Sequence, residues 1–176
     1  MTDFITQIDF NILNAIQSIR NPFLDTIMPL ITFLGSGGIV WAVTALIMLC
    51  FKKSRKTGIV IIVSLLLGLF LSTMGLKNVI ARERPYNTEE ALLTVENLLI
   101  SAPSGRFSFP SGHAISSFSA ATVILLYSKK LGIPAIILAA FICFTRLYLY
   151  VHFPSDVICG ALFGILLAFL SNFLVN

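Results

Sequence analysis

Long apolar runs, divided by short charged or glycine- and proline-containing breaks, fill most of the chain. Because a helix needs about 20 apolar residues to cross the hydrocarbon core of a bilayer, these runs predict an all-α integral membrane protein. The predicted architecture is a bundle of six transmembrane helices, at about residues 22–34, 39–51, 57–76, 112–127, 133–150 and 154–174. The first span is short and ends at the Gly-Ser-Gly-Gly sequence of residues 35–38, so it is expected to borrow length from the helix before it.

Residues 1–20 have a different pattern, in which apolar side chains recur at helical spacing between polar ones. This pattern predicts an amphipathic helix that lies in the membrane interface and turns at Asn21-Pro22. The segment carries Asp3 and Asp9, has no early Lys or Arg, and shows no small-residue cleavage site. We therefore expect it to remain on the protein rather than to be removed as a signal peptide.

The composition agrees with a membrane protein and limits the classes of binding partner. Hydrophobic residues make up 57% of the sequence and charged residues only 11%, with a mean hydropathy of +0.94, far from the balance of a soluble domain. Residues 1–176 are predicted to form a single domain, whose oligomeric state the sequence leaves open. Cys50, Cys143 and Cys159 lie inside apolar runs and are predicted to be small core residues. The net charge of +4 favours anionic membrane lipid over nucleic acid, because no basic stretch alternates with stacking aromatics.

Charge clusters predict the orientation of the bundle. Lys52, Lys53, Arg55 and Lys56 separate the second and third predicted spans, and Lys129-Lys130 separate the fourth and fifth. Cytoplasmic loops carry an excess of Lys and Arg, so both clusters are expected in the cytoplasm. With six spans, both termini and Arg20 would also be cytoplasmic, and the loop of residues 85–110 would be extracytoplasmic. A helix start at residues 87–90 suggests that this loop forms a short surface helix or lid.

Three polar islands interrupt the apolar runs, and all fall on the predicted extracytoplasmic side. They are Lys77 with Arg84-Pro85, then Pro110-Ser111-Gly112-His113, then Arg146 with His152 and Asp156. Together they offer two imidazoles, a carboxylate and three cations, a set suited to a phosphate ester under attack.

Each island also has a plain structural interpretation. Lys77 and Arg84, which would share a helical face if the third span continued past the surface, can simply reach for lipid headgroups. Ser111 can cap a helix, although free backbone N–H groups at a helix start also form an anion site. His152 and Asp156 can be an ion pair between two helices. An arginine such as Arg146 inside a span is costly, however, and favours a functional site.

The joint pattern is more specific than its parts. Lys77-x6-Arg84-Pro85, Pro110-Ser111-Gly112-His113 and Arg146-x5-His152-x3-Asp156 match, in order and spacing, a three-part signature. In this the chain resembles the type-2 phosphatidic acid phosphatase family, membrane lipid phosphatases related to the vanadium haloperoxidases. One departure is visible, because Thr145 stands where the family usually has Ser. Threonine keeps the hydroxyl, so a tuned contact is expected rather than a lost site.

The resemblance implies a role for each motif residue. His152 would attack phosphorus and become a phosphohistidine, Asp156 would orient it, and His113 would protonate the leaving oxygen and then activate water. The phosphoryl oxygens would be held by Lys77, Arg84, Ser111, Gly112 and Arg146. No metal or other cofactor is expected, because the acidic residues are not spaced as a magnesium cage. Arg82 and Arg106 are expected to contact headgroups or the lipid surface.

The resemblance therefore implies a metal-independent enzyme that dephosphorylates a membrane lipid phosphate or diphosphate at the outer membrane face. Undecaprenyl diphosphate is the first choice of substrate, and phosphatidylglycerophosphate or phosphatidate is the alternative. An alternative of another class is a transporter or flippase for anionic lipid, in which the buried cations and histidines form a relay. Transport has no need for a His-x3-Asp pair opposite a second histidine, so the sequence favours the enzyme.

Overall fold

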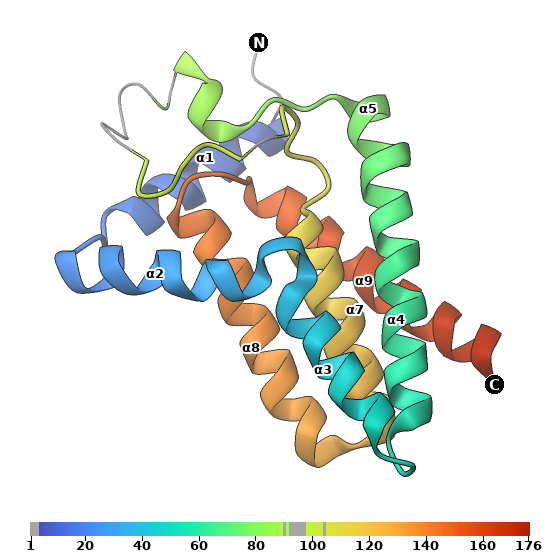
Figure 1. Cartoon of the computed structure of the whole chain (residues 1–176). Helices are drawn as coiled ribbons and strands as arrows, with labels where there is room; N and C mark the ends of the chain where they lie inside the picture. Colours follow the sequence, from blue (N-terminus) through green and yellow to red (C-terminus); the bar gives the residue numbers. More distant parts are fainter. Residues whose placement is uncertain (1–3, 90, 92–97, 104) are drawn as a thin grey trace.

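The computed structural model describes residues 4–89, 91, 98–103 and 105–176, and the chain it describes is built from helices (Figure 1). The all-α prediction is confirmed. The α-helices are α1 (Phe4–Gln17), α2 (Pro22–Gly35), α3 (Ile39–Cys50), α4 (Arg55–Phe70), α5 (Lys77–Ile80), α7 (Gly112–Tyr127), α8 (Lys129–Tyr148) and α9 (Pro154–Val175). Shorter segments are a 3-10 turn η1 (Ser36–Gly38), a π-helix η2 (Leu71–Leu76) that joins α4 to α5, and a 3-10 turn η3 (Pro85–Asn87).

Helix α7 lies at the centre of the bundle and packs against α4, α8 and α9. Its small and branched residues, such as Ala120 and Val123, meet Val60 of α4 and Ala139 of α8 in the main apolar core. Large apolar side chains also cover the outside of the bundle, including Leu66, Phe70, Ile137, Leu166 and Phe173. An outer surface of this kind suits lipid rather than water.

Two glycines let α9 approach α7 closely. A side chain at Gly160 would lie 2.8 Å from the carbonyl oxygen of Ser111, and one at Gly164 would lie 2.6 Å from the carbonyl oxygen of Ile115. Membrane helices commonly use small residues for such backbone contact. The contact at Gly160 matters for the site, because it fixes the start of α7 against the first turns of α9.

The first two predicted spans form one bent unit, so the predicted count of six is not confirmed. Helix α2 has 14 residues and is about 21 Å long, shorter than the roughly 30 Å hydrocarbon core. Gly37 and Gly38, with φ of 59° and 70°, bend the chain from α2 into α3 without a hairpin. The α2–α3 unit (Pro22–Cys50) is one of three helical segments of the described chain with the length and apolar composition of a span, the others being α8 and α9.

Helix α2 lies obliquely across one end of the bundle, where it follows the end of α8 (Figure 1). Its Asp25 accepts a hydrogen bond from Tyr148, and a side chain at its last residue, Gly35, would meet Ile142. Tyr148 and Ile142 are separated by only about 9 Å along the axis of α8, so both ends of α2 lie near the same end of the bundle. The bundle is thus crossed by α2–α3 together, by α4 with its extensions η2 and α5, and by α7, α8 and α9.

This path differs from the expected one, in which both termini lie together, opposite the polar islands. Asp9 of α1 accepts a hydrogen bond from the backbone N–H of Ser155, at the first turn of α9. Near the other end of α9, Asn172 accepts a hydrogen bond from Tyr127 at the end of α7. The N-terminal helix and the C-terminal end of α9 therefore lie at opposite ends of the bundle. Arg20, predicted with the cytoplasmic cations, pairs with Asp25 at 3.2 Å beside α2.

The remaining boundaries follow the predictions closely. Helix α7 begins and ends at the predicted residues, and α9 differs by one residue at its end. Helix α1 has the predicted amphipathic character, with exposed Phe4, Ile5 and Ile8 and buried Asp9. In the loop of residues 85–110, residues 85–87 form η3, while the proposed lid helix falls largely on residues outside the described part.

Candidate active site

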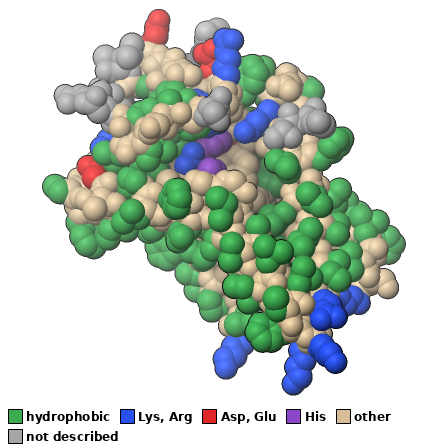
Figure 2. All heavy atoms as spheres, viewed as in Figure 1, with side chains coloured by type: hydrophobic (Ala, Val, Ile, Leu, Met, Phe, Trp, Pro, Cys, Tyr) green, Lys and Arg blue, Asp and Glu red, His purple; other side chains and the backbone are tan. Residues whose placement is uncertain are grey.

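Residues from all three polar islands line one cleft of about 380 Å³. From the predicted set it is lined by Lys77, Arg84, Gly112, His113, Arg146 and His152. Figure 2 shows the chain's two histidines in a hollow near one end of the molecule, with cationic side chains around them. Other Lys and Arg side chains gather at the opposite end, at the α3–α4 and α7–α8 connections. The structure thus brings together residues that lie far apart in the sequence.

The first island changes direction between its two cations. The helix that carries Lys77 ends at Ile80, and Ala81 adopts a left-handed conformation with φ of 49°. Arg84 is extended, with φ of −80° and ψ of 151°, so it does not share a helical face with Lys77. Its Nε donates to the carbonyl of Gly105 at 2.8 Å and its Nη1 to that of Val151 at 2.9 Å. Two backbone carbonyls therefore aim the guanidinium at the third island.

The third island contains a strained turn. Tyr150, fully buried, has φ of 59°, a conformation that costs a non-glycine residue of order 1 kcal/mol or more. This turn ends α8 and presents His152 to the cleft just before α9 begins. Such strain persists only where the surrounding packing enforces it. Here Tyr150 packs with Phe10, Leu13 and Phe153.

The contacts of His152 determine which nitrogen can act. Arg84 Nη1 lies 3.2 Å from Nε2. A guanidinium only donates hydrogen bonds, so Nε2 accepts and carries the lone pair. The proton of the neutral ring is then on Nδ1, which lies 3.6 Å from Oδ2 of Asp156. This arrangement points the lone pair of Nε2 toward the cations of the cleft.

The electrostatic setting keeps this imidazole neutral. Burial and the nearby Arg146 and Arg84 lower the pKa of His152 from 6.5 to about 4, while the neighbouring carboxylate of Asp156 opposes the shift. A neutral ring at physiological pH is the form that can attack phosphorus. His152 and Asp156 are accordingly an oriented pair rather than the ion pair of the structural interpretation.

Unpaired polar atoms gather at the site. Among the described residues, the buried side-chain atoms without a hydrogen-bond partner are Ser111 Oγ, His113 Nε2, Arg146 Nε, His152 Nδ1 and Ser171 Oγ. All but the last belong to the polar islands. Because an unpaired buried donor or acceptor costs roughly 1–3 kcal/mol, this cluster indicates a site shaped for a polar ligand. Ser111 lies at the N-cap position of α7, but its hydroxyl makes no capping bond.

Helix α2 contributes residues that the motifs did not indicate. Thr32 accepts a hydrogen bond of 2.7 Å from Arg146 Nη1 and so holds that guanidinium from the side. A side chain at Gly35 would lie 3.0 Å from the ring of His113, so glycine here gives the imidazole its space. Thr145, the departure from the family signature, donates its hydroxyl to the carbonyl of Ile142 within its own helix.

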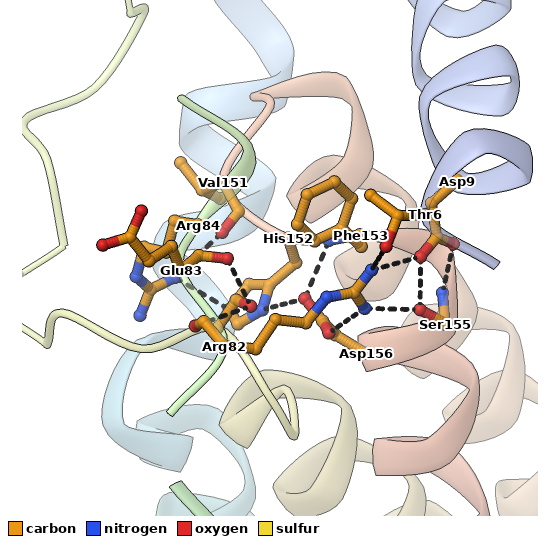
Figure 3. A network of polar contacts seen from close by, with 11 residues as sticks. Thr6, Asp9, Arg82, Glu83, Arg84, Val151, His152, Phe153, Ser155 and Asp156 are labelled. Carbon is orange, nitrogen blue, oxygen red and sulfur yellow. Dashed lines mark hydrogen bonds and ion pairs between the residues drawn. The ribbon is translucent and has the colours of Figure 1, made fainter. Parts of the chain in front are cut away.

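Arg82 does not have the surface role expected for it. Its Nη1 donates to Asp156 Oδ1 at 2.8 Å and its Nη2 to Asp9 Oδ2 at 2.7 Å (Figure 3). Arg106 does fit a surface position, since its side chain is 73% exposed and pairs with Glu83. The sequence held a weak signal for Arg82, an arginine inside the first polar island, and none for Asp9, which lies among the polar positions of the amphipathic stretch.

No group of three or more His, Cys, Asp or Glu side chains in the described part of the chain could hold a metal ion. The groups that face the cleft are cations, imidazoles and backbone. Metal-independent chemistry stays a prediction.

Comparisons with known proteins identify the family. The model of the PAP2 superfamily matches residues 57–176, which contain all three motifs. The chain is 37% identical over 149 residues to an undecaprenyl-diphosphatase of Sulfolobus acidocaldarius, covering 83% of this chain and 69% of that protein. It is 31% identical to phosphatidylglycerophosphatase B of Bacillus subtilis, covering 96% and 84% of the two chains.

Comparisons with solved structures indicate the same family. The chain superposes with a TM-score of 0.77 on the transmembrane PAP2-type phosphatidylglycerolphosphate phosphatase of Bacillus subtilis, with 28% identity and coverage of 98% and 87%. The TM-score is also 0.77 for LpxE of Aquifex aeolicus, with 29% identity and coverage of 92% and 93%. The motifs, the helical membrane fold and these matches together make the chain an integral membrane phosphatase of the PAP2 superfamily.

Proposed function

We propose that this protein removes phosphate from a membrane lipid phosphate or diphosphate through a phosphohistidine at His152. Undecaprenyl diphosphate is the first choice of substrate. The observation that carries the proposal is the oriented imidazole of His152, with Arg84 on Nε2 and Asp156 facing Nδ1, inside a cleft lined by further cations. Phosphoryl transfer needs this combination of a positioned nucleophile and fixed positive charge.

A second pocket supports a lipid substrate. It measures about 330 Å³, is lined mainly by apolar and glycine residues of α2 to α4 and α7, and shares Lys77, Gly112 and His113 with the polar cleft. A lipid phosphate has the same division, with a charged headgroup joined to an apolar tail. The continuity of the two pockets lets the phosphate lie at His152 while the first part of the tail lies between the helices.

The choice of undecaprenyl diphosphate rests on the relatives. A 37%-identical relative carries that activity in its name, whereas relatives at 31% identity are named for lipid A and phosphatidylglycerophosphate. Phosphatidylglycerophosphate or phosphatidate is therefore the alternative substrate.

In the first chemical step, Nε2 of His152 attacks phosphorus, and the bond from phosphorus to the leaving oxygen breaks. Lys77, Arg84 and Arg146 hold the phosphoryl oxygens, where negative charge is concentrated in the transition state, with the hydroxyl of Ser111 and the backbone of Gly112. His113 donates a proton to the leaving oxygen. Asp156 holds the Nδ1 proton and stabilises the positive charge that develops on the ring.

In the second step, water attacks the phosphohistidine. His113, now neutral, accepts a proton from that water, and the bond between phosphorus and Nε2 breaks. The products are inorganic phosphate and a His152 ring restored to its starting tautomer, and His113 again carries the proton that it gave up in the first step.

We further propose that the cleft opens on the extracytoplasmic side. The cations at the α3–α4 and α7–α8 connections lie at the opposite end of the bundle from the motifs, and the bias of Lys and Arg toward the cytoplasm supports this orientation. The C-terminal end of α9 would then be cytoplasmic, and α1 would lie outside beside the cleft.

Phosphate release from purified protein tests the substrate. The panel is undecaprenyl diphosphate, phosphatidylglycerophosphate, phosphatidate, a lipid A phosphate and p-nitrophenyl phosphate, each compared by kcat/KM. We expect undecaprenyl diphosphate to give the highest value and the tail-free ester the lowest among substrates that react. A higher kcat/KM for phosphatidylglycerophosphate or phosphatidate would select the alternative, and no release from any lipid would refute the proposed function.

Replacement of the nucleophile should abolish turnover. His152→Ala is expected to lower kcat by about a thousandfold or more while the protein stays folded in detergent, because no other group can form the covalent intermediate. Rapid acid quenching and mass spectrometry should detect phosphate on His152 of the wild-type protein. Substantial activity in His152→Ala, or phosphate on another residue, would contradict the assignment.

The role of His113 depends on the leaving group. His113→Ala should slow phosphatidate hydrolysis by about 10²- to 10⁴-fold, since an alkoxide needs the donated proton. The loss on p-nitrophenyl phosphate should be much smaller, because p-nitrophenolate leaves without one. Equal losses on both substrates would mean that His113 binds phosphate and is not the acid.

Accessibility to an impermeant thiol reagent tests the orientation. In a variant without native cysteines, Asn87→Cys and Asn11→Cys should react in intact cells, and Lys53→Cys should react only after lysis. All of these positions are exposed in the structure. If Lys53→Cys alone reacted in intact cells, the orientation would be the reverse of the one proposed.

A further inference from the structure

The carboxylate of Asp156 has contacts on both oxygens. Oδ2 accepts the backbone N–H of Phe153 at 2.9 Å and faces His152 Nδ1, while Oδ1 accepts Nη1 of Arg82 at 2.8 Å. Asp156 is fully buried, so water does not substitute for any of these partners. The direction in which Oδ2 faces the imidazole therefore depends on what holds Oδ1.

Arg82 is itself held in place. Besides Asp156, its Nη1 donates to Ser155 Oγ at 2.6 Å, and its Nη2 donates to Asp9 Oδ2. Its guanidinium carbon lies 4.0 Å from the centre of the Phe153 ring, within the range of a cation–π contact. The side chain is 20% exposed and extends toward Asp9 and Ser155, away from Arg84 (Figure 3). It is one cation between two carboxylates.

Asp9 connects this arrangement to α1. Its side chain is 3% exposed, and Oδ1 accepts the backbone N–H of Ser155 at 2.9 Å. A carboxylate at this place also complements the positive end of the α9 dipole. On the same helix, Phe10 packs edge-on against Phe153 with ring centres 5.2 Å apart. Helix α1 is thus attached to the turn that carries both catalytic side chains of the third motif.

We propose that Arg82 and Asp9 are positioning residues for the reaction, which hold Asp156 so that Oδ2 stays oriented toward the Nδ1–H of His152. The proposal rests on the proposed function for its catalytic consequence. Helix α1 then contributes to the reaction, in addition to lying in the membrane interface. Neither residue touches the substrate, and both act through Asp156.

Steady-state kinetics gives the first test. Arg82→Gln should lower kcat by about 10- to 100-fold and Asp9→Asn by about tenfold, as is typical when a partner behind an orienting group is lost. KM should change by less than about threefold, because the phosphate-binding cations stay in place. Arg20→Gln is the matched control. It breaks the Arg20–Asp25 pair near α1 and should leave kcat unchanged.

A double-mutant comparison separates positioning from a general structural effect. If Arg82 acts through Asp156, Arg82→Gln should change kcat of an Asp156→Asn enzyme by no more than about twofold. The proposal would be overturned if Arg82→Gln lowered kcat by the same factor in the wild-type and Asp156→Asn backgrounds. A rise in KM with unchanged kcat would overturn it as well. Melting temperature in detergent shows whether each variant is folded.

The tautomer of His152 can be read without any activity. The chain has only two histidines, so isotope-labelled histidine gives two imidazoles in an NMR spectrum, and His152→Ala assigns them. Because Arg84 stays on Nε2, we expect the Nδ1–H tautomer in every folded variant. The interaction with Asp156 is read from the Nδ1 proton, which should lie downfield in the wild type and in Arg20→Gln and move upfield in folded Arg82→Gln and Asp9→Asn. An unchanged Nδ1 proton shift in both folded variants refutes the positioning role, even if the protein proves to have another substrate.

Discussion

The site depends on one imidazole held between a donor and an acceptor. Arg84 occupies Nε2 of His152 from one side, and Asp156 faces Nδ1 from the other. A ring with a cation on its basic nitrogen cannot easily take up a second proton, and a ring with a carboxylate beside Nδ1 keeps its proton there. The same two contacts thus set both the charge and the tautomer. Everything around the ring either aims one of these groups or provides space for the phosphate.

The surrounding fold is shaped by the cost of placing such groups in an apolar bundle. Cations and imidazoles are tolerated in a membrane protein where they pair or line a cavity. Here Arg84 is tied to backbone carbonyls and Arg146 to Thr32. Gly35 and Gly160 bring neighbouring helices close to His113 and Ser111. The strained turn at Tyr150 persists because apolar side chains of α1 pack around it.

Sequence patterns predicted where the motif residues lie in the fold, because spacing in short motifs translates directly into position, while the roles of these residues in the reaction stay predictions. Ser111 to His113 open α7, and His152 lies at the turn between α8 and α9, as the polar islands indicated. Long-range partners were beyond such patterns. Nothing in the sequence joins Asp9 to Arg82, which are 73 positions apart, or Thr32 to Arg146. Arg82 was expected to face lipid since motif spacing does not tell which way an extended segment points.

The count of six spans was not confirmed, for a related reason. Hydropathy shows how long an apolar run is but not which way the chain turns after it. The glycines after α2 are compatible with a hairpin or with a bend. Positive φ at Gly37 and Gly38 produces a bend, and the consequence is functional as well as topological. A hairpin would have carried α2 across the membrane, away from the cleft. The bend instead keeps Thr32 and Gly35 beside Arg146 and His113.

The part of the chain outside the matched family region therefore contributes to the site. The PAP2 match begins at residue 57, so α1 to α3 lie before it, and yet they provide Asp9, Thr32 and Gly35. The motif residues determine what reaction the cleft supports. The helices before them determine how firmly two of its groups, Asp156 and Arg146, are held, and α2 and α3 also line the apolar pocket next to the phosphate cleft. A change in these helices can alter the site while every motif residue stays the same.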